Sequence, residues 1–206
     1  MIAIVNYGVG NLFSLSSSLN ALGFETVVTG SKDILKKAGK IILPGVGAFG
    51  DAADKLKSEG LDEFLINEAK NKKPLLGICL GMQLLFDKSY EYGIHSGLGL
   101  IKGCVRPIKD VCDKSLKIPH IGWNRLDLTN PPHPLFKHIK NGDYVYFVHS
   151  YYASDCSEST IAVTDYSAPL TAAVANKHVI GCQFHPEKSG RVGLEILRAF
   201  CETEEF

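Results

Sequence analysis

The stretch that decides the fold is residues 74–86, PLLGICLGMQLLF, where a short apolar run meets a helical pattern. Residues 75–78 are apolar and follow a proline, which predicts a buried strand, and the pattern after Cys79 predicts a helix. Cys79 therefore stands at a strand-to-helix turn, with Gly77 and Gly81 two residues to either side. Ligand sites in open parallel sheets lie at the carboxyl ends of strands, so this turn is where chemistry is expected.

Strand and helix signals alternate in the sequence before this turn. The apolar run at 2–5 and the segments 25–28 and 40–43 predict three strands, and helical patterns occupy 12–22 and 51–71. Asn11 is placed to cap the first helix and Gly23 to end it. This rhythm, with continuously apolar strands, predicts an α/β fold with a mostly parallel central sheet flanked by helices.

The second half of the sequence has a different character. Between about 100 and 183, strand-like segments such as 144–148, 171–175 and 179–184 are separated by turn residues, and helical patterns are few. We expect antiparallel additions to the sheet here, followed by a last helix over about 192–200. No repeat or linker interrupts the chain, so residues 1–206 are expected to form a single domain.

Composition excludes several classes of protein. Lysine plus arginine and aspartate plus glutamate both number 22, so no excess charge points to nucleic acid or to an anionic membrane. The N-terminus lacks the pattern of a signal peptide, and the longest apolar run is far short of the roughly 20 residues that span a bilayer. The six cysteines are scattered without a CxxC pair. Reduced thiols in a cytoplasmic protein are expected.

Cys79 has the setting of a nucleophile. A sharp strand-to-helix turn is strained and tolerates only small neighbours, as in the G-x-S-x-G nucleophile turn, here with sulfur in place of oxygen. Free N–H groups at a helix N-terminus favour a thiolate, and the Leu80 N–H is placed to hold an oxyanion. The alternative is that Cys79 is a small core residue, as most cysteines in such runs are.

A thiol nucleophile needs a base, and His185 is the best candidate among the seven histidines. It follows the apolar run 179–184 and precedes Pro186 and Glu187. Proline favours an extended conformation at His185, and residues i and i+2 of an extended chain point to the same side. Glu187 is therefore expected to orient the imidazole, completing the parts of a triad. Taken alone, the HPE sequence would indicate only a surface turn with a solvated ion pair.

Two glycine-rich turns and one histidine are open to other interpretations. The turn at 44–47, PGVG, ends a strand and could supply a further N–H to the oxyanion, from Val46 or Gly47. The NYGVGN segment at 6–11 resembles a dinucleotide-binding turn, but Phe13 stands where the third glycine should be, so a nucleotide site is not expected. His149 has no partner at metal-ligand spacing, and no metal site is predicted.

Three motifs taken together resemble the class I, or triad, glutamine amidotransferases: PGVGAFG at 44–50, GICLGMQLLF at 77–86 and FHPEKSG at 184–190. Within that family, NYGVGNL, PHIGWN, YFVHSYYA and the Lys188-Ser189 pair are similar to the glutaminase subunits that pass ammonia to a (β/α)8 cyclase in histidine biosynthesis. The resemblance runs over nearly the whole chain.

This resemblance implies a fold, an activity and a set of site residues. It implies Cys79 as nucleophile, His185 as general acid and base, and Glu187 as its orienting carboxylate. It places L-glutamine against a pocket formed by Gly47, Gln83, His149, Ser150 and Tyr151. It also puts Asn11, Trp123 and Lys188 at the interface of a heterodimer, and it implies no cofactor. The two glycines beside Cys79 would leave room for the turn and for a substrate carbonyl.

Two other functions remain open at this level. A paralogous glutaminase could keep the triad and serve a different synthase. The chain could also be a catalytically silent binding subunit, but the presence of Cys79, His185 and Glu187 argues against this function.

Overall fold

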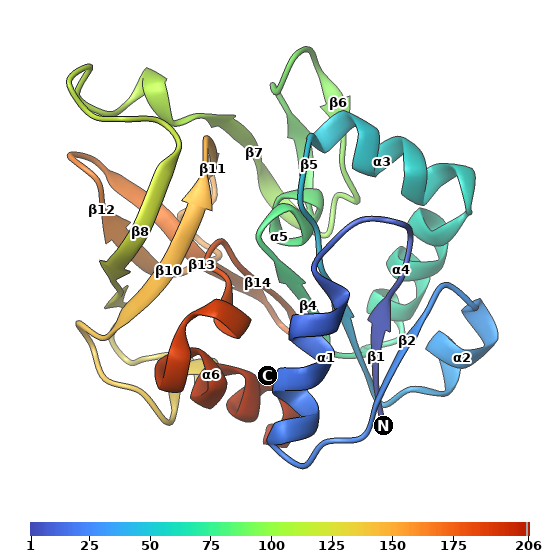
Figure 1. Cartoon of the computed structure of the whole chain (residues 1–206). Coiled ribbons are helices and arrows are strands. Elements are labelled where there is room, and N and C mark those ends of the chain that lie inside the picture. Colours follow the sequence, from blue (N-terminus) through green and yellow to red (C-terminus); the bar gives the residue numbers. More distant parts are fainter. Residues whose placement is uncertain (205) are drawn as a thin grey trace.

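The computed structural model describes residues 1–204 and 206, and its main feature is one long sheet of mixed direction (Figure 1). In spatial order the sheet consists of β2 (Thr26–Thr29), β1 (Ile2–Val5), β3 (Lys40–Leu43), β4 (Leu75–Ile78), β14 (Val179–Cys182), β13 (Pro169–Asn176), β12 (Thr160–Asp165) and β9 (Asp127–Leu128). The strands from β2 to β14 are parallel to one another, and β13, β12 and β9 extend the sheet in antiparallel pairing.

Helices cover both faces of the parallel half. α1 (Leu12–Ala21) and α6 (Gly190–Glu202) pack on one face; α2 (Lys32–Lys37), α3 (Phe49–Ser58) and α4 (Leu61–Lys70) pack on the other. Alternate residues of each strand enter opposite clusters, as Ile4 packs with Leu19 of α1 and Val5 with Leu56 of α3. Because both faces are covered, the central strands β1, β4 and β14 are buried at every position and carry no charged side chain.

Two smaller sheets stand beside the main one. β8 (His120–Arg125) and β10 (Tyr144–His149) form an antiparallel ribbon, visible as a separate pair in Figure 1. β11 (Tyr151–Ser154), β7 (Ile101–Pro107), β5 (Phe86–Ser89) and β6 (His95–Ser96) form the other. Short 3₁₀ turns lie at η1 (Ile108–Asp110), η2 (Pro134–Phe136) and η3 (Pro186–Lys188), and α5 (Leu80–Leu84) follows β4 directly.

The predicted fold class is confirmed: an α/β protein with a mostly parallel sheet, flanking helices and antiparallel strands in the second half. Several boundaries differ from the expectation. The helical pattern at 51–71 is two helices, because Gly60 adopts a left-handed conformation between them. α2 was not expected, and β5 and β7 pair in parallel rather than antiparallel.

No helix within residues 1–204 is both long enough and apolar enough to cross a lipid bilayer.

Candidate active site

Cys79 lies at the turn between β4 and α5, as the sequence predicted. Its backbone has φ 55° and ψ −112°, a conformation that residues other than glycine rarely adopt. The turn is held by its neighbours, because the Cys79 N–H donates to the Cys182 carbonyl at 2.8 Å and its carbonyl accepts from the Gln83 N–H at 3.1 Å. Such strain, maintained by the surrounding structure, is typical of functional turns.

The glycines on either side of Cys79 are required by backbone packing. A Cβ atom on Gly77 would lie 2.6 Å from the Gly81 carbonyl oxygen, and one on Gly81 would overlap the Leu43 carbonyl oxygen at the end of β3. The space beside the glycines is therefore filled by backbone. The sequence-based expectation that it would receive a substrate carbonyl is wrong for these two positions.

His185 follows β14 and is brought to the same edge of the sheet as Cys79. Its ring is 3% exposed, and its Nδ1–H donates to the Glu187 carboxylate oxygen Oε1 at 2.8 Å. His185 is extended, with φ −99° and ψ 98°, but Glu187 lies in the 3₁₀ turn η3. The expected His–Glu pair is therefore present, although a tight turn and not an extended chain brings the two side chains together.

Opposing influences act on the His185 imidazole. Burial favours the neutral ring. Hydrogen bonds to Cys79 and Glu187, together with the negative charge of these two groups, favour the imidazolium. The net effect raises the pKa of His185 to about 9. The second Glu187 oxygen, Oε2, is buried and has no hydrogen-bond partner within the described residues, 1–204 and 206. The pair is therefore poised to hold a proton on the histidine beside the thiol.

A cavity of about 300 Å³ opens beside Cys79 and His185. This volume is at the lower end of the range for small-molecule pockets and suits a ligand the size of an amino acid. It is lined by Val46, Gly47, Cys79, Leu80, Gln83, Glu91, Pro119, Val148, His149, Ser150, Tyr151, His185 and Lys188. Every residue that the sequence analysis assigned to the oxyanion or to the substrate pocket is in this lining, whereas Asn11 and Trp123 are not.

Sequence reasoning missed Glu91. Its carboxylate lines the cavity and accepts a hydrogen bond from the Phe49 N–H, at the start of α3, at 2.7 Å. Burial raises the pKa of Glu91, and the Phe49 hydrogen bond opposes this shift. Glu91 lies in a turn after β5 without periodic pattern, so only its tertiary position marks it.

A continuous chain of hydrogen bonds runs from the thiol to the β8–β10 ribbon. Buried Gln183 places its Nε2 3.7 Å from the Cys79 sulfur and accepts from Gln83 Nε2 at 2.9 Å. Gln83 Nε2 also donates to the Tyr151 carbonyl, which accepts a second hydrogen bond from His149 Nδ1–H at 2.8 Å. Because Gln83 Nε2 has two acceptors, the Gln83 amide is fixed in orientation against the cavity.

His149 ends this chain by pairing with a second histidine. Its Nε2 accepts from His120 Nδ1–H at 3.0 Å, since the His149 Nδ1–H is already used. Burial lowers the pKa of His149 to about 3 and that of His120 to about 4, so both rings are neutral near pH 7. His149 is therefore a neutral hydrogen-bond donor that fixes the position of the Tyr151 carbonyl.

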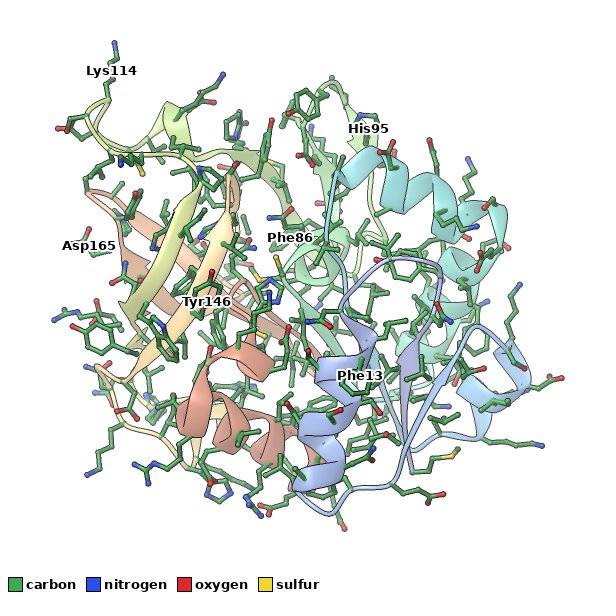
Figure 2. All side chains as sticks on the ribbon, in the orientation of Figure 1. Phe13, Phe86, His95, Lys114, Tyr146 and Asp165 are labelled. Carbon is green, nitrogen blue, oxygen red and sulfur yellow. The ribbon has the colours of Figure 1, made fainter. Side chains whose placement is uncertain are left out.

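Exposed Trp123 and Lys188 pack on the half-buried Tyr146, and Lys188 also lines the cavity. Trp123 is 55% exposed and packs edge to face on Tyr146, with ring centroids 6.2 Å apart. The Lys188 Nζ lies 6.0 Å from the centre of the Tyr146 ring, which is labelled on β10 in Figure 2. Asn11 caps α1, because its side chain accepts a hydrogen bond from the Ser14 N–H. Phe13, at the start of the same helix, is 82% exposed (Figure 2).

Comparison with known proteins at the level of sequence shows the family. The family model for class-I glutamine amidotransferase matches residues 3–203. The imidazole glycerol phosphate synthase subunit HisH of Sulfurimonas denitrificans is 48% identical over 97% of both chains. HisH of Bacillus subtilis is 46% identical over 97% of this chain and 95% of that one.

The solved structures agree on the fold. A crystal structure of a glutamine amidotransferase superposes with a TM-score of 0.76 over 98% of both chains at 18% identity. The PurLQS structure from Thermotoga maritima gives a TM-score of 0.73 at 21% identity, over 97% of this chain and 96% of that one.

Proposed function

The chain belongs to the class-I glutamine amidotransferase family, and from this premise we infer that it is the glutaminase subunit of an imidazole glycerol phosphate synthase. It hydrolyses glutamine to glutamate and ammonia, and the ammonia serves histidine biosynthesis. The observation that carries the proposal is the strained Cys79 turn beside the buried His185–Glu187 pair, with Cys79 and His185 both lining one cavity.

The first half of the proposed reaction is attack by sulfur on the side-chain amide of glutamine. The Cys79 thiolate forms a bond to the amide carbon, and the carbonyl electrons move to oxygen. The imidazolium of His185 then gives its proton to the departing nitrogen as the C–N bond breaks, which releases ammonia and leaves a glutamyl thioester. Glu187 keeps the ring oriented through Nδ1.

The second half returns the enzyme to its starting state. Neutral His185 takes a proton from water, the oxygen attacks the thioester carbon, and glutamate leaves as the C–S bond breaks. We assign the oxyanion of each tetrahedral intermediate to the N–H groups of Leu80 and of Val46 or Gly47, which line the cavity.

The other cavity residues are proposed to recognise the amino-acid part of glutamine. Glu91 presents a carboxylate suited to the α-ammonium group, and Gln83 presents an amide of fixed orientation. His149, Ser150 and Tyr151 supply backbone and side-chain groups on the opposite wall.

The acceptor of the ammonia is proposed to lie on a second protein. We propose that the chain acts as a single domain in the cytoplasm and forms a heterodimer with a (β/α)8 cyclase. Asn11, Trp123 and Lys188 are assigned to that interface, because Trp123 and Lys188 are exposed next to the cavity mouth.

Replacing Cys79 by alanine tests the proposal. We expect Cys79→Ala to lose glutamine hydrolysis by more than about 1000-fold, a loss of over ~4 kcal/mol of transition-state stabilisation. The cyclase complex should still turn over with ammonium salt in place of glutamine. Cys112→Ala is the matched control, because Cys112 is as buried, at 8% against 7%, and lies in a separate apolar cluster.

Hydrolysis by Cys79→Ala within tenfold of wild type would exclude a covalent mechanism at this thiol. Ammonium-driven turnover with a different synthase, and none with the cyclase, would favour a paralogous glutaminase.

A further inference from the structure

The NYGVGN segment at 6–11 connects β1 to α1, and the proposed function gives it no task beyond the assignment of Asn11 to the partner interface. It forms a tight loop, in which the Gly8 N–H donates to the Asn6 side chain at 3.2 Å and both Gly8 and Gly10 have positive φ. Tyr7, in this loop, is 1% exposed. A buried tyrosine in a surface loop requires a partner for its hydroxyl.

That partner is the turn at 44–47. The Tyr7 hydroxyl donates to the Pro44 carbonyl oxygen at 2.8 Å, in a buried hydrogen bond between segments 37 residues apart. The same loop also contacts the proline ring, since a Cβ atom on Gly10 would lie 3.2 Å from Pro44 Cβ. Two residues of the segment therefore hold Pro44.

Gly45, the next residue of the turn, is also closely surrounded by other segments. A Cβ atom there would lie 2.8 Å from the Gly81 nitrogen, 2.9 Å from Leu80 Cβ and 3.0 Å from the Tyr7 hydroxyl oxygen. The first half of the turn is thus held between Tyr7 and the start of α5, which directly follows the nucleophile Cys79.

The second half of the turn is free. Val46 is 44% exposed, and apart from the two chain neighbours of Gly47, no atom of the described residues lies within 4 Å of the place a Cβ would take on Gly47, whose φ is +96°. Both residues line the cavity, and within residues 1–204 no hydrogen bond uses the N–H of either. Their orientation is therefore set by the clamped half of the turn.

We propose that Tyr7 is a positioning residue that holds the Pro44 carbonyl and thereby aims the N–H groups of Val46 and Gly47 at the developing oxyanion. This inference rests on the proposed glutaminase function and assigns a role to the 6–11 segment. Tyr7 touches neither substrate nor the reacting atoms, and acts only through the turn.

The hydroxyl is suited to this role over a wide pH range. Burial, and after it the nearby Cys79, raise the pKa of Tyr7 well above its usual value. The group therefore stays protonated and remains a donor while the thiol and the imidazole change charge. Its removal would leave a buried carbonyl without a partner and release the turn.

The test is Tyr7→Phe in the complex with the cyclase and its nucleotide ligand. Full loss of one oxyanion donor costs ~10²–10³ in rate, and we expect a loosened turn to lower kcat for glutamine hydrolysis about tenfold. KM for glutamine should stay within twofold of wild type, because the donors act on the oxyanion and not on the bound substrate. Thr164→Val is the control, since it removes a hydroxyl of another buried residue, on β12, that donates to a carbonyl oxygen, that of Arg125, at 2.8 Å.

A second measurement on the same variant distinguishes misorientation of the oxyanion donors from a general loss of stability. L-Glutamate γ-semialdehyde forms a tetrahedral adduct with the thiol, so Tyr7→Phe should bind it about tenfold more weakly, with glutamate affinity unchanged. Gly10→Ala, which pushes on the Pro44 ring with Tyr7 intact, should lower kcat in the same way.

The outcomes are distinct. Wild-type kcat and semialdehyde affinity in a folded Tyr7→Phe would overturn the inference and leave the proposed function standing. An equal loss of kcat in Thr164→Val would also overturn it, because the effect would then be one of general stability. Absence of glutamine hydrolysis in the wild-type complex would instead overturn the proposed function.

Discussion

At the scale of single residues, the Cys79–His185–Glu187 arrangement depends on charge placed where water is excluded. His185 is nearly inaccessible, and a buried imidazole alone would be neutral at pH 7. His149, with no carboxylate partner, shows this behaviour, and its pKa falls to about 3. The interactions with Cys79 and Glu187 therefore change which protonation state the fold favours.

The first residue-scale prediction concerns the pKa of His185. In Glu187→Gln the hydrogen bond is kept but the negative charge is lost, so we expect the pKa to fall from about 9 while burial continues to oppose the charged ring. Histidine NMR over a pH titration measures this shift. His133, whose pKa is lowered by burial elsewhere, is the internal control.

The raised pKa of His185 also makes the stability of the fold depend on pH. Because the folded pKa of His185 is raised above about 6.5, its protonation stabilises the fold fully below that pH, and this contribution is lost as the pH rises through about 9. The stability advantage of wild type over Glu187→Gln should therefore shrink between pH 6.5 and pH 9.5 in urea titrations. An unchanged pKa in the variant would show that Glu187 does not hold the proton on the ring.

At the scale of elements, the β4–α5 turn places a thiol at the carboxyl edge of the sheet by bringing three backbone segments into contact. α5 begins directly after Cys79 and runs against the end of β3. Only glycine at position 81 allows this approach, because any side chain there meets the Leu43 carbonyl. Local preference and packing therefore oppose each other at Gly81.

This conflict gives the element-scale prediction. In a helix, glycine to alanine is stabilising by about 1 kcal/mol on propensity alone. At Gly81 we expect Gly81→Ala instead to lower the free energy of unfolding by ~2 kcal/mol or more, in the range of overpacked cores. Urea unfolding measures the difference.

Gly39→Ala is the control, because the nearest atom to its Cβ would be 3.9 Å away, and it should change stability by less than ~0.5 kcal/mol. If Gly81→Ala proved as stable as Gly39→Ala, the close approach of α5 to β3 would not require glycine.

At the scale of the whole molecule, the cavity opens beside an aromatic and basic cluster formed by Trp123, Tyr146 and Lys188. Exposed aromatic and cationic side chains are enriched at protein interfaces. We propose that the ammonia leaves toward a partner protein that covers this surface.

The molecule-scale prediction is dependence on that partner. We expect weak glutaminase activity from the isolated chain, rising about 100-fold or more when the cyclase and its nucleotide ligand are added. Lys188→Ala should weaken complex formation or ammonia transfer, because the cation over Tyr146 is lost at the cavity mouth. Calorimetry measures the first effect, and the ratio of glutamine-driven to ammonium-driven turnover measures the second.

Lys102→Ala, an exposed lysine on β7, is the control and should change neither quantity. Full turnover by the chain alone, unchanged by the liganded cyclase, would mean that the protein is a stand-alone amidase.

The sequence by itself determined the parallel half of the sheet and the position of the thiol. Apolar runs at 2–5, 40–43 and 75–78 coincide with β1, β3 and β4, because strands buried on both faces need apolar residues throughout. The join at Cys79 followed from the change of period, and the nearness of His185 to Glu187 followed from their separation by two residues. These features depend on neighbours in the chain.

Only the tertiary structure decided what surrounds them. Glu91 enters the cavity from a turn without pattern, Gln183 reaches the Cys79 sulfur across β14, and Tyr7 holds Pro44 from 37 residues away. Gly81 is needed because the end of β3, far earlier in the chain, lies against its backbone. Each of these contacts joins segments that the sequence keeps apart, and their geometry is set by how the strands pair and how closely backbones pack, which no local pattern specifies.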